Sequence, residues 1–265
     1  MGSDEGSHAS TTSVPLRGAV TIVNEALGTL NNTPFAQAAV EYAFSEGVLV
    51  VASAADEQSY HHNYPAQYER VFWANSIRPE DGTLVTAPTN LLLNGCTNFG
   101  GKAQVAIAST ACSSEATERA SGMFALLYSA AMNEIDRGNL TAHPITGKAL
   151  SPNESIQLMQ MTADDIDFSS GLSLDFDPQL ALLLPQLTSD RFPTHAGHDK
   201  YTGYGRANAA EAVARVAPGT IPPEAEIVSP VWHDVIDPSV TPLLDVVGTA
   251  AAHRNANEFE YTVEW

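Results

Sequence analysis

The fold is decided by one stretch of the sequence, residues 19–53, which reads AVTIVNEALGTLNNTPFAQAAVEYAFSEGVLVVAS. It opens with an apolar strand signal at 19–23. Apolar residues at helical spacing follow Thr33, a good N-cap, and end at Gly47. The wholly apolar run at 48–53 is typical of an interior strand of a parallel sheet. A strand, a helix and a strand in so short a stretch form a βαβ unit, which predicts an α/β fold with right-handed crossovers.

The sequence after this unit predicts more of the same architecture. Two further apolar runs read as strands. A long helical pattern is apolar on most sides, so we expect a central, buried helix. A capping box at Ser151, with proline at the first helical position, opens another helix. The expected elements are strands at 71–77 and 103–107 and helices at 115–137, 152–161 and 208–216.

The chain divides into four expected regions. Residues 1–13 are small and polar, without the basic and apolar regions of a signal peptide, and are expected to be a leader or a disordered segment. One α/β domain is expected at 14–217, followed by a linker at 218–223, PGTIPP. Residues 224–265 are expected to be a truncated β-rich domain, the start of a β-sandwich. Its predicted strands lie at 243–248 and 258–265, the second with strict alternation.

The charge balance excludes some classes of partner. The chain has 31 acidic and 12 basic residues, a net charge of −19. Such a charge opposes nucleic acid and anionic membrane surfaces, because both are polyanions. No apolar run approaches the roughly 20 residues of a membrane span.

The two cysteines leave two interpretations open. Cys96 and Cys112 could close a small loop worth roughly 3 kcal/mol if they are oxidised. In a reducing compartment they would instead be unpaired small hydrophobic residues.

The stretch most relevant to chemistry is 112–122, CSSEATERASG. It places hydroxyl groups at the start of the long helix, where backbone N–H groups and the helix dipole can stabilise a developing oxyanion. The alternative is that Ser113 or Ser114 only caps the helix.

This stretch resembles the serine motif of subtilisin-like peptidases, G-T-S-M-A-x-P-H-x-A-G. The shared positions of Ala116 and Gly122 select Ser114 as the nucleophile. Cys112, Ser113, Glu115, Glu118 and Arg119 depart from the motif.

Neighbouring segments extend the resemblance across residues 19–216. Ala26, Leu27 and Gly28 resemble the S-L-G edge that pairs with substrate backbone. Residues 47–57, GVLVVASAADE, resemble the family's G-V-x-V-V-A-A-A-G-N-E strand, with Asp56 at the place of the oxyanion-hole asparagine. An ionised Asp56 would repel an oxyanion, whereas a protonated one could donate a hydrogen bond. Further similar segments are YPA at 64–66, TNFG at 97–100 and GYGRANA at 203–209.

The resemblance implies a subtilisin-like, mostly parallel sheet with helices on both faces, and secretion from the cell. It implies a serine endopeptidase that acts on peptide or protein substrates. The family's catalytic aspartate and histidine motifs are not evident, and HAS at 8–10 is only weakly similar to the histidine motif. Without a base, a serine hydroxyl is a poor nucleophile, so this chain could be inactive. The alternative is a non-catalytic, peptide-binding pseudopeptidase.

Other polar residues give weaker signals. His61 with His62, and His195 and His198 with Asp199, could suggest a metal, but solvated loop histidines explain them better and no metal site is predicted. Calcium remains an expectation from the resemblance, with loop carboxylates as candidates. These carboxylates are Asp164, Asp165, Asp167, Asp175 and Asp177.

Overall fold

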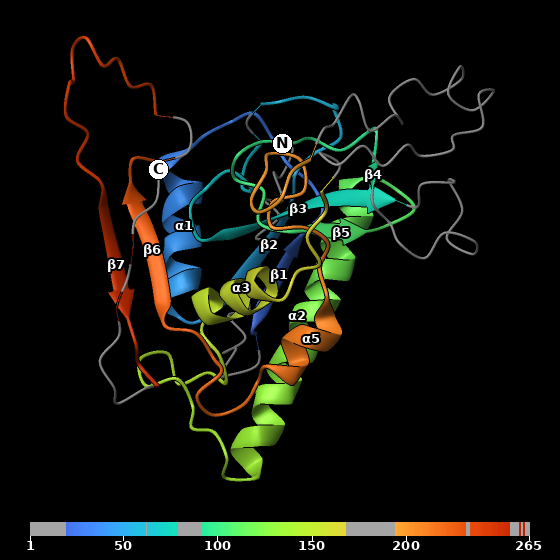
Figure 1. The fold of residues 1–265 in the computed structure, drawn as a ribbon, viewed down its shortest axis with the longest axis vertical. Helices are drawn as coiled ribbons and strands as arrows, with labels where there is room; N and C mark the ends of the chain where they lie inside the picture. The colour runs from blue at the N-terminus through green and yellow to red at the C-terminus, as the bar shows by residue number, and fades with distance from the viewer. Residues whose placement is uncertain are drawn as a thin grey trace, which may run out of the picture.

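A computed structural model describes residues 20–61, 63–78, 92–167, 194–231, 234–254, 260 and 262 (Figure 1). It is built around one mixed sheet with helices packed on it, and a small second sheet. The strands are β1 (Ile22–Glu25), β2 (Leu49–Ser53), β3 (Val71–Arg78), β4 (Leu92–Leu93), β5 (Ala106–Ala108), β6 (Glu224–Ser229) and β7 (Val247–Ala251). The helices are α1 (Pro34–Ser45), α2 (Ser113–Asp136), α3 (Pro152–Met161) and α5 (Ala209–Ala214).

The main sheet has four parallel strands, in the order β1-β2-β3-β5, and one antiparallel strand, β4, beside β3. Ile22 pairs with Leu49, and Val50 pairs with Val71. The βαβ unit expected at 19–53 is therefore present as β1, α1 and β2. Strands β2 and β3 are almost wholly buried, as expected for interior parallel strands.

Helices cover both faces of this sheet, as predicted. In Figure 1 the sheet lies between α1 and α2. Because side chains alternate along a strand, Leu49 and Val51 join the α2 core while Val50 and Ala52 face α1. Phe72 of the α2 core packs edge-on against Phe124, with ring centroids 4.8 Å apart.

Two helix starts follow their sequence signals. The Thr33 side chain accepts a hydrogen bond from the Ala36 N–H at 3.2 Å, and the chain turns out of α1 at Gly47 with φ of 71°. At α3 the capping box forms in both directions between Ser151 and Glu154.

Helix α2 differs from the expectation in its burial. It starts at Ser113, two residues before the expected start, and only one side of it is buried. Phe124 and Leu127 are fully buried, but Leu126 and Met132 are exposed. The prediction of a helix buried on most sides is therefore wrong, because among the described residues the sheet, α3 and α5 cover one side of α2 and leave the other exposed. No helix in the described ranges is long and apolar enough to cross a membrane.

The second sheet pairs β6 with β7 in antiparallel fashion. Strand β7 begins at Val247, later than the strand expected at 243–248. Residues 243–246 are exposed and irregular. The strand expected at 258–265 lies almost entirely outside the described residues. The described part of 224–265 thus contains a two-stranded sheet, and the β-sandwich stays a prediction.

Strand β6 is fastened to the main body by an arginine. The Arg70 guanidinium binds Glu226 through two hydrogen bonds, of 2.7 and 3.1 Å, and also pairs with Glu41 of α1. Within the expected linker 218–223, Ile221 is only 3% exposed and packs in the α2 core. This segment is therefore anchored to the core rather than free.

Candidate active site

The candidate site lies where the carboxyl ends of β1 and β2 meet the first turn of α2. Parallel α/β sheets bind ligands at this edge, because the strands end there and the helix N–H groups point toward it. The chain leaves β1 into Ala26 and β2 into the loop that carries Asp56. The fold thus brings together the three segments that the sequence singled out.

Ser114 lies in the first turn of α2 and is half-buried. Its Oγ donates a hydrogen bond to the Ala26 carbonyl at 3.1 Å. In the part of the chain that the structure describes, no histidine is bonded to this hydroxyl. The geometry therefore joins the predicted nucleophile to the predicted substrate-binding edge, without the base.

Ser113, in contrast, is fully buried and points toward β2. Its Oγ lies 2.6 Å from the Ser53 Oγ and donates to the Asp56 Oδ1 at 2.5 Å. Its backbone carbonyl accepts a hydrogen bond from the Thr117 hydroxyl at 2.7 Å. Because the Ser113 hydroxyl is committed to these inner contacts, Ser113 is a structural residue.

Asp56 caps helix α2 from another part of the chain. The N-cap residue, Cys112, makes no side-chain capping bond. Instead, the Asp56 Oδ1 also accepts the Ser113 N–H at 2.8 Å. A carboxylate is favourable at a helix N-terminus because it faces the positive end of the dipole. The same negative charge competes with any oxyanion for this end of the helix.

The segment Ala26–Gly28 is partly exposed among the described residues. Leu27 is 65% exposed. The residue after Gly28, Thr29, exchanges two backbone hydrogen bonds with Tyr64, of 2.9 and 2.8 Å. Gly28 has no room for a side chain, because a Cβ there would lie 2.0 Å from the Asn63 Nδ2. This atom in turn donates to the Ser53 carbonyl at 3.0 Å, so the edge is fixed to the end of β2.

Asn98 supports the loop that carries Asp56. Its Oδ1 accepts the N–H groups of Glu57 and Ser59 at 3.1 and 3.0 Å. Its own N–H donates to the carbonyl of Ala55, which has φ of 70° where the family motif has glycine. Sequence analysis found Asn98 in a segment similar to the family but gave it no role. It did not identify Asn63 as part of the site.

A disulfide joins this loop region to the start of α2. Cys96 and Cys112 are bonded, with Cα atoms 5.7 Å apart, and the Cys96 carbonyl accepts a hydrogen bond from the Gln58 N–H at 3.3 Å. The Asn94 side chain donates to the Ala111 carbonyl at 2.6 Å. The disulfide, Asn94 and Asp56 therefore all hold the first turn of α2.

Glu115 fixes the turn that precedes α2. Its carboxylate accepts the N–H groups of Thr110 and Ala111 at 3.0 and 2.6 Å and pairs with Arg119. Burial acts to raise the pKa of Glu115, but these hydrogen bonds and the arginine lower it below its ordinary value. Glu115 and Arg119 depart from the family motif and here form an ion pair.

The weaker candidates are mostly engaged in structural contacts. His198 bonds the Ala103 carbonyl through Nε2 at 2.8 Å, and Asp199 closes its own turn through the Tyr201 and Thr202 N–H groups. Asp164 binds Arg206, and Asp165 accepts from Gly197. His61 lies 3.3 Å from Glu57. Of the remaining candidates, three lie outside the described residues, namely His62, Asp175 and Asp177. Asp167 lies within them.

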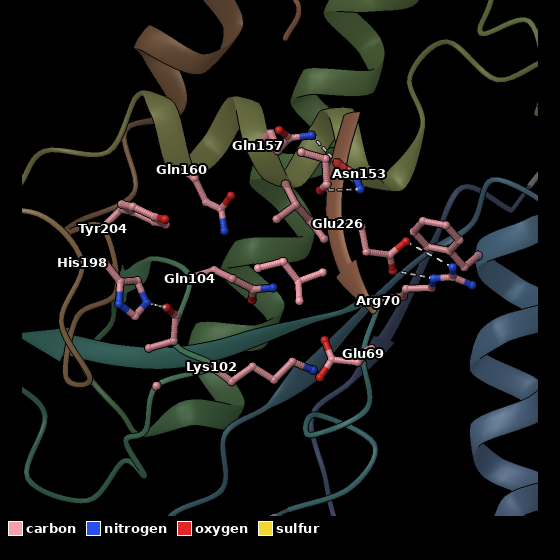
Figure 2. A pocket seen from close by; sticks show the side chains of 16 residues that line it. Glu69, Arg70, Lys102, Gln104, Asn153, Gln157, Gln160, His198, Tyr204 and Glu226 are labelled. Atoms are coloured by element: carbon pink, nitrogen blue, oxygen red, sulfur yellow. Dashed lines mark hydrogen bonds and ion pairs between the residues drawn. The ribbon is translucent and has the colours of Figure 1, made fainter. Parts of the chain in front are cut away.

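A separate pocket of about 450 Å³ opens between β6, α3 and the loop at 101–104 (Figure 2). Figure 2 shows Lys102 and Glu69 pointing toward each other at its floor. Burial lowers the pKa of Lys102 to about 8, although Glu69 acts to raise it. The Lys102 ammonium donates to the carbonyls of Ala66 and Tyr68, so it is committed to the backbone. Neither Ser114 nor its hydrogen-bond partner Ala26 is among the residues that line this pocket.

Comparison with known sequences gives one family. The family model of the subtilase family, Peptidase_S8, matches residues 2–205. No curated protein matches the chain.

Comparison with solved structures gives the same fold. The prenylagaramide maturation protease PagA is similar with a TM-score of 0.51 and 16% identity, over 75% of this chain and 62% of that one. A protease of Pseudoalteromonas arctica is similar with a TM-score of 0.50 and 17% identity, over 78% of this chain and 55% of that one. The matched part thus spans less than two thirds of either structure, and identities this low show the fold alone.

Proposed function

The chain belongs to the subtilase family of serine peptidases, and from this premise we propose that Ser114 is the nucleophile of a serine endopeptidase site. The observation that carries the proposal is the hydrogen bond from the Ser114 Oγ to the Ala26 carbonyl. It ties the hydroxyl at the start of α2 to the exposed edge at Ala26–Gly28. A peptide that pairs with this edge as an added strand would bring a carbonyl within reach of Ser114.

The reaction requires a base. A histidine takes the Ser114 proton as the oxygen attacks the substrate carbonyl carbon, and it returns this proton to the leaving amine. Water then hydrolyses the acyl-enzyme. The N-terminal N–H groups of α2 can stabilise the oxyanion of each tetrahedral intermediate. No described residue supplies this base to Ser114, so the proposal assigns the histidine and its aspartate to positions outside the described residues.

A second function is favoured by Asp56. Its carboxylate occupies the helix end that an oxyanion would need, and it accepts hydrogen bonds where the family's asparagine donates one. A chain with this arrangement could bind peptides at Ala26–Gly28 without turning them over. This non-catalytic, peptide-binding role is the alternative to the peptidase.

The proposal extends to the setting of the protein. Peptides or proteins are the proposed substrates, by virtue of the family. Secretion is the proposed location, and it is supported by the disulfide between Cys96 and Cys112, since such bonds persist in oxidising compartments.

The test separates the two functions. The chain, Ser114→Ala and the control Ser129→Ala, an exposed serine on the same helix, are compared in two assays. The first is hydrolysis of casein and chromogenic peptides together with labelling by a fluorophosphonate, and the second is binding of an uncleaved peptide. Turnover and labelling that are lost in Ser114→Ala alone support the peptidase.

Binding without turnover or labelling in any of the three proteins supports the peptide-binding alternative. Turnover that survives in Ser114→Ala would overturn the assignment of the nucleophile. Loss of a triad residue typically costs on the order of 10⁴ or more in turnover, so the difference is easily measured.

A further inference from the structure

Three side chains that are far apart in the sequence meet outside the candidate active site. His143 lies in the loop between α2 and α3, Glu224 begins β6, and His253 follows β7. The Glu224 Oε2 lies 3.5 Å from the His143 Nε2 and 3.1 Å from the His253 Nε2. All three potential ligand atoms lie within 4.8 Å of one another.

These distances suit a small divalent ion. Zinc binds histidine nitrogen at about 2.0–2.1 Å and carboxylate oxygen at a similar distance, so tetrahedral ligand atoms lie roughly 3.3 Å apart. The two pairs that include Glu224 are already close to this spacing. The two imidazole rings are nearly perpendicular, at 84°, with centroids 5.2 Å apart.

The buried histidine gives an independent indication. The side chain of His143 is only 2% exposed, and its Nε2 makes no hydrogen bond within the described part of the chain. A buried polar nitrogen without a hydrogen bond is costly and rare. A metal ion bound to this nitrogen would satisfy it.

The surroundings hold the ligands in place. The His143 Nδ1 accepts a hydrogen bond from the Thr146 N–H at 3.2 Å and also lies 3.2 Å from the Thr146 hydroxyl, and these contacts fix the orientation of the ring with its Nε2 toward Glu224. The Ser151 hydroxyl donates to the Glu224 Oε1, which leaves Oε2 turned toward the histidines. Such outer contacts orient metal ligands in known sites.

The local charge also allows a cation. Arg254 is adjacent to His253 in the chain, but its guanidinium is paired with the Glu154 carboxylate at 2.5 and 3.0 Å. It also donates to the carbonyls of Thr141 and Ala149. The carboxylate of Glu224 is therefore not neutralised by this arginine.

We propose that His143, Glu224 and His253 form a binding site for a divalent transition metal of the zinc class. Two imidazole nitrogens and one carboxylate are ligands that zinc accepts, with water in the fourth position. Calcium is disfavoured because it takes six to eight oxygen ligands. A bound ion would fasten both strands of the small sheet to the α2–α3 loop, and the site is separate from the peptidase proposal.

The test is zinc binding by the full chain, measured by equilibrium dialysis in excess Ca²⁺, which occupies diffuse acidic sites. The matched variants are His253→Gln, His143→Gln and Glu224→Gln. His195→Gln is the control, because His195 is exposed and, within the described part of the chain, its hydrogen bond is to its neighbour Ala196. We expect one zinc per chain in the parent and the control. Removal of a ligand should weaken binding at least about tenfold, since even outer-shell changes cost roughly 10–100-fold.

Thermal unfolding gives a readout that does not depend on activity. With zinc at about 100 times its dissociation constant, the melting temperature of the parent and of His195→Gln should rise by roughly 5 to 10 °C. That of His253→Gln should hardly change. His253 is partly exposed, so this variant carries the test if His143→Gln fails to fold.

Two results would overturn the site. One is zinc affinity in His253→Gln equal to that of the parent. The other is an equal rise in melting temperature for the parent and His253→Gln, which would place the bound metal elsewhere.

Discussion

Asp56 accepts both the backbone N–H and the hydroxyl of Ser113 on a single oxygen, Oδ1, at 2.8 and 2.5 Å. One carboxylate thus supplies the cap that Cys112 does not give to α2. The same carboxylate stands beside the helix turn that carries the proposed nucleophile. Helix stability and oxyanion binding therefore make opposite demands on this position.

The capping role of Asp56 predicts that Asp56→Ala destabilises the protein. Loss of the cap should lower the free energy of unfolding by about 1–2 kcal/mol. Asp56→Asn should lose less, because its amide oxygen can still accept the Ser113 N–H. Urea unfolding measures both, and Asp245→Ala, at an exposed carboxylate, should stay within about 0.5 kcal/mol of the parent. Equal stability of Asp56→Ala and the parent would show that Asp56 does not cap the helix.

The effect of Asp56 on oxyanion binding predicts how Asp56→Asn changes the reactivity of Ser114. The amide can donate a hydrogen bond to an oxyanion, and an oxyanion-hole donor is worth roughly 10²–10³ in rate. We expect Asp56→Asn to react with a fluorophosphonate at least about tenfold faster than the parent. Asp56→Ala, which removes the charge without adding a donor, is the control and should gain less. A fluorophosphonate rate in Asp56→Asn equal to that of the parent would show that Asp56 does not influence the reaction of Ser114.

Gly28 and Gly122 give a matched pair of glycine substitutions. In Gly28→Ala the new Cβ would meet the Asn63 amide and displace its bond to the Ser53 carbonyl, so we expect lower stability and weaker peptide binding. A Cβ at Gly122 would have no neighbour within 4 Å, and this glycine is exposed inside α2, so Gly122→Ala should stabilise the protein. The gain should be about 0.5–1 kcal/mol. Chemical unfolding measures the stability of the two variants, and peptide titration measures their peptide binding. An unchanged peptide affinity in Gly28→Ala would contradict the proposed peptide-binding edge.

Local signals in the sequence predicted the local structure well. The Thr33 cap and the Ser151 capping box depend on residues three positions apart, so a single sequence suffices to find them. The apolar run at 48–53 likewise identified β2, because interior parallel strands are buried on both faces. The family resemblance then supplied the order of the segments around the site.

Contacts between segments that are far apart in the sequence could not be predicted from such local signals. The bond between Ser113 and Asp56 joins residues 57 positions apart, and its direction depends on how α2 meets β2. Strand β6, Glu224–Ser229, was missed because its pattern is short and largely exposed. The grouping of His143 with Glu224 and His253 requires that strand to be placed first.

The disulfide predicts a dependence on redox conditions. Cys96 and Cys112 close a loop with a sequence separation of 16, which is worth about 3 kcal/mol in the chain-entropy account. The double variant Cys96→Ser with Cys112→Ser should therefore unfold at lower urea concentration. Reductant should lower the stability of the parent to a similar level and leave the double variant unchanged. A parent insensitive to reductant under unfolding conditions would contradict a stabilising bond.

The pair of Asp164 and Arg206 predicts how stability depends on pH. The Asp164 carboxylate accepts hydrogen bonds from the Arg206 Nη2 at 2.7 Å and the Asn208 Nδ2 at 3.0 Å. Burial acts to raise the pKa of Asp164, but these bonds and the arginine charge hold it below its ordinary value. The unfolded carboxyl therefore takes up its proton at a higher pH than the folded one.

From this sign, the stabilisation by Asp164 is fully present above its unfolded pKa, about 3.9, and is lost as the pH falls through the lower folded pKa. We expect the free energy of unfolding to fall below about pH 4, and to fall less steeply in Asp164→Asn. Urea unfolding at a series of pH values measures the slopes, with Asp245→Asn as the control that should follow the parent. Parallel slopes for the parent and Asp164→Asn would show that the ion pair does not contribute to acid sensitivity.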